Sequence, residues 1–449
     1  MAAPIPEAAP VTSAVRPVST GEEVVGLMAQ EATTAEADPT ETSGNGRLRT
    51  LPVAGWIDAL KVHRGISHHG FSSHGEPQES RPGGSTAERP QNGDQRPCPY
   101  PGDCLMLVGR RPPIAVRRPS DMTSNADLTA AIEQALRAPS VHNTQPWRFR
   151  IHPDGVELHA DWIRHLAWTD PGRRDLVISC GAALHHLRVA LAAQRFAVRV
   201  DRLPDPENQG HLATVTVVAG AIDPEAAALR PAIGRRRTER RRMSQRVVPA
   251  ALIANLAEVA RAEGAIVLPV GGGIRSQLDA ALIEAAREQA VAPGYAAELQ
   301  LWTHRYAGSH DGVPAGNIAA PPPGLVHSSL LRQFSDAALP QPRQPAGTGS
   351  SDDAAELLVL VTIDDDHLAW LRTGEALSAV LLTATRLGLA TTPLSQGVEI
   401  ENVRRKIRRS ILQVTEHPQL IVRVGWPVPG AAELPVTGRR DLRLVLLRP

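Results

Sequence analysis

Residues 138–147 read Ala-Pro-Ser-Val-His-Asn-Thr-Gln-Pro-Trp and are the most informative stretch of the 449-residue chain. Prolines and small residues fix a turn here, while the Ser140 hydroxyl and the Asn143 and Gln145 amides offer hydrogen-bond donors and acceptors. Such a set suits the edge of a planar heterocycle such as a flavin. It equally suits a capped helix end followed by a strand, so residue chemistry alone leaves both interpretations open.

Helical and strand patterns alternate around this loop, which indicates an α/β or α+β fold. The pattern predicts helices over residues 124–137, 175–195, 249–263, 274–289, 369–389 and 402–412, and strands over residues 148–151, 156–160, 212–219, 356–363 and 420–425. Residues 308–350 show no regular pattern.

Two of the predicted helices carry a short internal repeat. Gly181-Ala-Ala-Leu-His-His-Leu matches Gly374-Glu-Ala-Leu-Ser-Ala-Val, and each helix is followed by a Val-rich strand. This similarity favours duplication and fusion, with the two copies related by a pseudo-two-fold axis. His185 and His186 are adjacent in the first helix, so we expect them to point to different faces and not to share a metal ion.

The stretch Arg235-Arg-Arg-Thr-Glu-Arg-Arg-Arg242 places six arginines in eight residues. Arginine binds phosphate oxygens through a planar fork, and Thr238 adds a hydroxyl, so the stretch is a candidate site for one terminal phosphate. A solvated helix face is the alternative. Nucleic-acid binding is disfavoured because no aromatic residues are interleaved with these arginines.

Overall composition excludes several broad classes. The 48 basic and 47 acidic residues leave a net charge of +1, which gives no global attraction to nucleic acid or acidic lipid. Three cysteines are too few for a disulfide framework and suit a reducing cytoplasm. The N-terminus lacks a signal-peptide pattern, and no 18-residue apolar run is present. We therefore expect a cytoplasmic protein that does not contact membranes.

The first 121 residues differ from the rest of the chain. Proline and glycine make up 28 of these 121 residues but only 47 of the following 328. This composition predicts a disordered N-terminal extension. Its histidines (His63, His68, His69, His74) and its cysteines (Cys98, Cys104) fit no common zinc spacing, so the sequence predicts no metal site there or elsewhere.

Four separated motifs together resemble the Acg family of nitroreductase-like flavoproteins. The motifs are Ala138-Pro-Ser-x-His-Asn-x-Gln-Pro-Trp147, Arg236-Arg-Thr-x-Arg240, Gly374-Glu-x-Leu-Ser-Ala-Val-Leu-Leu-x-Ala-Thr-x-x-Gly-Leu-Ala-Thr391 and Arg423-Val-Gly425. The likeness runs from about residue 124 to residue 445 and leaves the N-terminal extension uncovered.

This resemblance implies an α+β, nitroreductase-like fold made of two fused halves, each with a mainly antiparallel sheet packed by helices. The implied boundaries are 1–121 for the extension, 122–228 for the first half and 229–449 for the second, which includes a candidate lid at 309–349. The chain would then be an intramolecular pseudo-dimer. Only the first half carries the Asn/Gln/Trp loop and only the second carries the arginine motif, so one FMN site per chain is expected.

The resemblance also assigns residues to that FMN site. The phosphate and ribityl end would be bound by Arg236, Arg237, Thr238, Arg240, Arg439 and Arg440. The isoalloxazine would contact Pro139, Ser140, Asn143 and Gln145 on one side and Thr392, Pro393 and Leu394 on the other. No protein side chain is predicted to act as a catalytic acid or base, since a bound flavin carries its own redox chemistry.

The implied function is NAD(P)H-dependent reduction of nitroaromatic or quinone-like acceptors. An alternative is a flavin-sequestering, stress-linked FMN-binding protein, in which residues 309–349 close the site and prevent turnover. Visible absorption of the purified chain, followed under anaerobic conditions with NAD(P)H, discriminates the two.

Overall fold

The computed structural model describes residues 123–306, 308–320, 338–343 and 354–448. The predicted N-terminal extension lies outside these ranges, as do parts of the candidate lid. The described residues fall within one compact unit.

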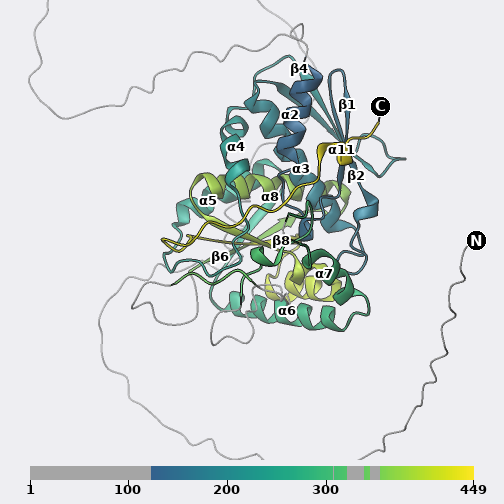
Figure 1. Cartoon of the computed structure of the whole chain (residues 1–449). Coiled ribbons are helices and arrows are strands. Elements are labelled where there is room, and N and C mark those ends of the chain that lie inside the picture. Colours follow the sequence, from purple (N-terminus) through teal and green to yellow (C-terminus); the bar gives the residue numbers. More distant parts are fainter. Residues whose placement is uncertain (1–122, 307, 321–337, 344–353, 449) are drawn as a thin grey trace, which may run out of the picture. The chain divides into compact units, whose positions relative to one another are not determined.

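Two four-stranded antiparallel sheets form the framework, with the same strand order in each (Figure 1). The first has the order β1-β2-β4-β3 and the second the order β5-β6-β8-β7. The strands are β1 (Trp147–His152), β2 (Gly155–Ala160), β3 (Ala197–Arg202), β4 (His211–Val218), β5 (Ile266–Val270), β6 (Glu356–Thr362), β7 (Ala390–Leu394) and β8 (His417–Gly425). The predicted α+β class with one antiparallel sheet per half is confirmed.

Helices connect and cover the sheets. They are α2 (Asn125–Ala135), α3 (Arg174–Ala193), α4 (Pro224–Arg235), α5 (Ala250–Ala262), α6 (Gly272–Val291), α7 (Tyr295–Thr303), α8 (His367–Arg386), α9 (Gln396–Glu399), α10 (Glu401–Lys406) and α11 (Leu442–Val445). At the start of α2, the Ser124 hydroxyl accepts from the Asp127 backbone N–H while the Asp127 carboxylate accepts from the Ser124 N–H. This reciprocal cap explains why the helix begins where the sequence predicts.

The central strand β6 shows how one apolar run serves two layers. Its alternate residues Leu358 and Leu360 pack into the cluster formed with α5 and α8. Leu357, Val359 and Val361 pack into the opposite cluster, formed with α6 and α10. Because both faces are covered, the strand is a continuous hydrophobic run without polar alternation.

The sequence patterns missed three strands, and all three lie at sheet edges. They are β3, β5 and β7. The strand β3 carries exposed charges, while β5 and β7 contain Pro269 and Pro393. Charged residues and prolines are what edge strands tolerate, because one side of their backbone has no strand partner to bond.

The helices α3 and α8 lie side by side and cross at two glycines (Figure 1). A Cβ atom on Gly181 would lie 2.0 Å from the Leu371 carbonyl oxygen, and one on Gly374 would lie 2.0 Å from the Ile178 carbonyl oxygen. In both cases the carbonyl belongs to the residue three positions before the glycine of the other helix. The contact is therefore reciprocal, as in a two-fold interface. These are the glycines that align in the internal repeat.

His185 and His186 follow Gly181 in α3, and both approach the same hydroxyl of α8. Their Nδ1 atoms lie 2.7 and 2.8 Å from the Ser378 Oγ, so the prediction that they face apart is wrong. The close helix crossing brings Ser378 between the two rings. His186 Nδ1 donates to the Ala182 carbonyl, and burial holds the pKa of both imidazoles well below the usual value.

Within the described residues, α3 is long and apolar enough to cross a membrane by length and composition. In this structure 89% of its apolar window is buried inside the protein. Its apolar character is used for packing between the first sheet and α8.

We predict that Gly374→Ala destabilises the protein by about 1–3 kcal/mol, because the added methyl group overlaps the Ile178 carbonyl and forces the two helices apart. Urea unfolding of the two proteins measures the difference. Gly172→Ala is the matched control, since a Cβ there meets nothing within 4 Å. Equal stability of the Gly374 variant and the wild-type chain would contradict a tight crossing.

Candidate functional site

The loop at residues 138–147 has a strained backbone that neighbouring groups hold in place. His142, Asn143 and Gln145 all have positive φ angles, of 46°, 55° and 52°. The Ser140 hydroxyl accepts a 2.9 Å hydrogen bond from the Gln145 backbone N–H, and the fully buried Trp147 anchors the end of the loop in the core. Strained backbone that the surrounding structure fixes is typical of functional sites.

A pocket of about 680 Å³, counted with its space open to solvent, brings this loop together with the arginine stretch. It also includes the C-terminal segment around residue 437. The lining residues are Arg137, Pro139, Ser140, Asn143, Ile233, Arg236, Arg237, Thr238, Arg240, Val313, Asn317, Leu434, Pro435, Val436, Thr437 and Arg439.

Positive charge dominates this pocket. Arg236 is 6% exposed, and its Nε and one terminal nitrogen have no hydrogen-bond partner among the described residues. Arg439 donates to the carbonyls of Arg137, Thr437 and Gly438, which are all neutral acceptors. Neither arginine forms an ion pair within 4 Å in the described part of the chain.

Burial and, to a smaller extent, the neighbouring arginines together lower the pKa of Arg236 to about 10 and that of Arg439 to about 9. The lowered pKa values mean that the folded protein, without a bound anion, disfavours the charged form of both guanidinium groups. Uncompensated buried charge is costly, and an anion with several oxygens would offset that cost through charge-assisted hydrogen bonds. The donor set therefore fits a phosphate group.

A second pocket of about 610 Å³, again counted with its space open to solvent, adjoins the first and shares Pro139, Ser140, Thr238 and Arg240 with it. The remaining lining residues are Val141, His142, Asp175, Ile178, Ser179, Leu377, Pro393, Ser395 and Leu420. One pocket is thus cationic and the other offers apolar walls, so together they suit a ligand with an anionic end and a less polar body.

Nine of the thirteen site residues that the sequence suggests line these pockets. They are Pro139, Ser140, Asn143, Arg236, Arg237, Thr238, Arg240, Pro393 and Arg439. The other four, Gln145, Thr392, Leu394 and Arg440, line neither pocket.

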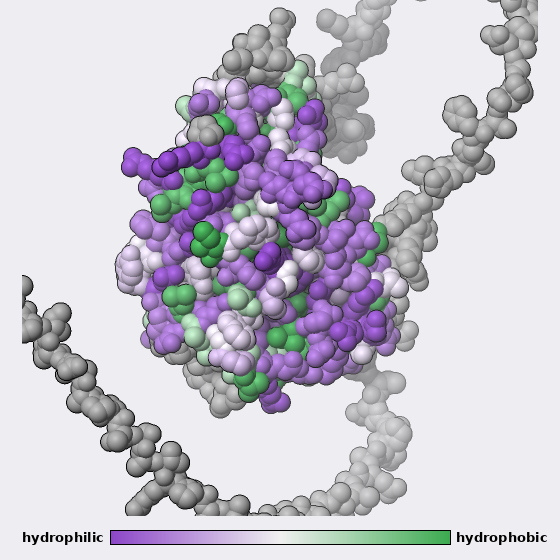
Figure 2. Space-filling view, turned by 90° about the vertical axis from the view of Figure 1, so that its right-hand side faces the viewer, coloured by the Kyte–Doolittle hydropathy of each residue, from purple (hydrophilic) through white to green (hydrophobic). Residues whose placement is uncertain are grey.

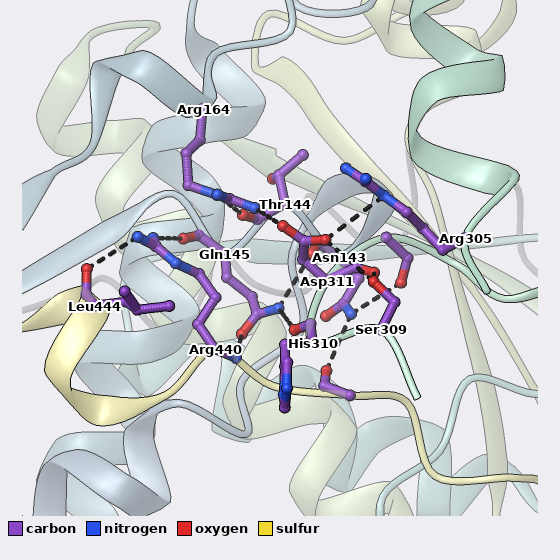
Figure 3. Close-up of polar contacts among 12 residues, drawn as sticks. Asn143, Thr144, Gln145, Arg164, Arg305, Ser309, His310, Asp311, Arg440 and Leu444 are labelled. Carbon is purple, nitrogen blue, oxygen red and sulfur yellow. Dashed lines mark hydrogen bonds and ion pairs between the residues drawn. The ribbon is translucent and has the colours of Figure 1, made fainter. Parts of the chain in front are cut away.

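Gln145 and Arg440 bind other parts of the protein (Figure 3). Gln145 is fully buried, and its side-chain oxygen accepts a 2.8 Å hydrogen bond from the Arg440 backbone N–H. Arg440 donates to the Gln145 carbonyl and to the Asp161 carboxylate, both at 3.0 Å. The charge of Arg440 thus already has a buried carboxylate partner, and a phosphate role for Arg440 stays a prediction.

Thr392 and Leu394 lie on β7, next to Pro393. The Thr392 hydroxyl donates to the Glu239 backbone carbonyl, and Leu394 packs into the core beneath α6 and α10. Successive strand residues point to opposite faces, so only part of this three-residue run can face a ligand.

Residues 309–317, named here the strap, are the first part of the candidate lid and contact the loop (Figure 3). The Asn143 side-chain amide donates to the Gly312 and Gly438 carbonyls at 2.9 and 3.1 Å, and the Gln145 amide donates to the His310 carbonyl at 2.8 Å. Asp311 forms ion pairs with Arg164 and Arg305.

The strap also contributes Val313 and Asn317 to the cationic pocket. These residues lie about 170 positions from the loop in sequence, so their approach to it is a result of the tertiary structure.

Comparison with known proteins identifies relatives with the same combination of features. The chain is 41% identical over 317 residues to "Putative NAD(P)H nitroreductase Rv3131" of Mycobacterium tuberculosis, covering 70% of this chain and 88% of the relative. The chain belongs to this nitroreductase-like family. Another member, "Putative NAD(P)H nitroreductase acg" of the same organism, is 32% identical over 332 residues, covering 72% of this chain and 96% of that member. The resemblance to the Acg family is confirmed.

No protein-family model matches the chain. Among solved structures, a nitroreductase with bound FMN from Bacteroides fragilis aligns with a TM-score of 0.30 at 14% identity, covering 46% of this chain and 93% of that one.

We predict that Arg440→Ala lowers the free energy of unfolding by about 1.5–3 kcal/mol, because it removes the shorter of the two ion pairs to the buried Asp161 carboxylate and leaves only the one to Arg148, at 3.3 Å. Urea or guanidinium unfolding measures this loss. Arg443→Ala, at an exposed position on α11, is the matched control and is expected to change stability little. A stable Arg440 variant that had lost only ligand affinity would restore Arg440 to the pocket.

Proposed function

We propose that the two adjoining pockets hold one FMN per chain. The observation that carries this proposal is the cluster of Arg236, Arg237, Arg240 and Arg439 at one end. The buried Arg236 and the half-buried Arg439 have no carboxylate partner among the described residues. FMN has a single phosphate at one end and a flat ring system at the other, which matches a cationic pocket that opens into a more apolar one. Bound FMN supplies the hydride-transfer chemistry.

The chain's own residues bind and orient the cofactor in this proposal. Arg236, Arg237, Arg240 and Arg439 hold the phosphate and ribityl end, and Thr238 adds a hydroxyl. Pro139 and Ser140 contact the ring system from the first half of the chain, and Pro393 contacts it from the second. Asn143 lines the cationic pocket, but its amide hydrogens are used to hold the strap and the C-terminal segment.

Both halves contribute to this one site. The loop at 138–147 comes from the first half, while the arginines, the strap and residues 434–439 come from the second. Together with the repeated sheet topology and the reciprocal glycine crossing, this supports the interpretation of the chain as a fused pseudo-dimer. A single FMN follows, because each half lacks the motif that the other carries.

The proposed reaction is NAD(P)H-dependent reduction of nitroaromatic or quinone-like acceptors. The support is the family relationship, since relatives at 41% and 32% identity carry the name of NAD(P)H nitroreductases. Within the proposed site no acid–base pair is required from the protein, because its role is to bind the cofactor, orient it and exclude water.

We predict that Arg236→Gln and Arg439→Gln each weaken FMN binding about tenfold or more while riboflavin binding changes little, because only FMN carries the phosphate. Fluorescence titration of the apoprotein with both ligands measures the two affinities. Arg261→Gln, on the exposed surface of α5, is the control. Equal losses for FMN and riboflavin would place these arginines away from the phosphate, and two FMN per chain would contradict the fused-subunit interpretation.

The second candidate function is FMN sequestration without turnover. The observation that favours it is the strap, which lines the cationic pocket and is held by Asn143, Gln145 and the Asp311 ion pairs. A segment held this firmly would limit the access of NAD(P)H and acceptors to the flavin.

We predict that Asp311→Ala, which removes the ion pairs to Arg164 and Arg305, speeds anaerobic reduction of the bound flavin by NADPH if the strap restricts access. Stopped-flow absorbance measures the rate, with Asp154→Ala at an exposed turn as the control. Fast reduction in the wild-type chain, unchanged in the variant, favours an ordinary reductase and rules out sequestration by the strap.

A further inference from the structure

A second cluster of chemically active side chains lies on the first sheet, away from the proposed FMN site. Glu157 and His159 are on β2, and His211 is on β4. One ligand atom from each of these three residues lies within 4.8 Å of the others. His152, on β1, adds a third imidazole beside the same carboxylate.

The strand register places these residues on one face of the sheet. Glu157 and His159 are two apart on β2 and therefore point to the same side. His211 lies directly opposite His159 because the β2–β4 register shifts between Leu158 and His159. This bulge lets the adjacent residues Leu212 and Ala213 both be buried in the core, while His211 is left on the polar face.

The carboxylate is the centre of the cluster. Glu157 Oε1 lies 2.8 Å from His152 Nε2, and Glu157 Oε2 lies 2.8 Å from His159 Nε2. The Glu157 and His159 side chains are only 15% and 12% exposed, so the group is substantially sheltered although it lies on the outer face. The rings of His159 and His211 are stacked, with centroids 4.6 Å apart.

We propose that Glu157, His159 and His211 form a binding site for a divalent transition-metal ion of the Zn²⁺ class, with His152 as a candidate fourth ligand. Imidazole nitrogen and carboxylate oxygen are ligands that Zn²⁺ takes at about 2.0–2.2 Å in a tetrahedral arrangement, so the ligand atoms of a site lie about 3.3–3.6 Å apart. The three ligand atoms lie within 4.8 Å of one another, so the longest distance closes by at most about 1.5 Å, while the 2.8 Å distance between His159 Nε2 and Glu157 Oε2 opens slightly. Side-chain rotation on fixed strands supplies movements of this size.

Neighbouring groups affect metal binding at this site, some against it and some in its favour. Arg150, opposite Glu157 on β1, donates to Glu157 Oε2 at 3.0 Å and competes with a metal ion for that oxygen. Burial, the largest single influence, raises the pKa of Glu157, but the neighbouring imidazoles together lower it by more, so the net change is downward. Burial lowers the pKa of His211, which favours the neutral imidazole that a metal requires.

The test measures Zn²⁺ binding to the full-length chain by isothermal titration calorimetry, with the protein purified without a polyhistidine tag. The background variant carries Asn at His63, His68, His69 and His74 and Ser at Cys98 and Cys104, so that these residues cannot contribute. We expect one Zn²⁺ per chain. His159→Asn and His211→Asn are each expected to weaken Zn²⁺ binding about tenfold or more. Losing a residue that only supports a metal ligand already costs about that much, and these two residues are proposed to be ligands themselves.

Arg150→Gln is the most discriminating variant. It removes the cation that competes for Glu157 and is therefore expected to tighten Zn²⁺ binding. Partial unfolding of the variant would weaken binding instead. His367→Asn, at the start of α8 and not a member of the cluster, is the matched control and is expected to leave the affinity unchanged. Circular dichroism and flavin content establish that each variant is folded. No Zn²⁺ uptake by the background variant, or equal uptake by the His159→Asn/His211→Asn double variant, would overturn the proposal.

Discussion

The reciprocal contact of Gly181 and Gly374 is the constraint on which the rest of the structure depends. Two helix backbones can approach this closely only where neither carries a Cβ atom, since an added one would lie 2.0 Å from a carbonyl oxygen. The crossing fixes α3 against α8 and thereby brings both halves of the chain together. The candidate site needs both halves, because its loop comes from the first and its arginines come from the second.

The arginines divide into two kinds by their partners and not by their position in the sequence. Arg440 and Arg241 have buried carboxylate partners, Asp161 and Glu239. Arg236 and Arg439 have none within the part of the chain that the structure describes. Only the second kind can attract an anionic ligand strongly, because a paired guanidinium has its charge already compensated. The fold therefore selects binding groups from a larger set of similar residues.

The loop at 138–147 serves binding and assembly together. Pro139 and Ser140 line both pockets, while Asn143 and Gln145 use their amide hydrogens to hold the strap and the C-terminal segment. An amide can donate two hydrogen bonds, and in Asn143 both are accepted by backbone carbonyls. The proposed cofactor site and the segment that borders it are consequently coupled through the same residues.

The sequence by itself determined the class of fold, the buried strands, the repeat around Gly181 and Gly374, the family and nine of the residues that line the two pockets. These features are local, because periodicity, small residues and short motifs report directly on burial and backbone conformation. Tertiary structure alone decided the pairing of Arg440 with Asp161, the orientation of Gln145 and Leu394, and the meeting of His159 with His211 across a bulge. Each of these depends on contacts between segments far apart in the chain, whose register and approach no local pattern specifies.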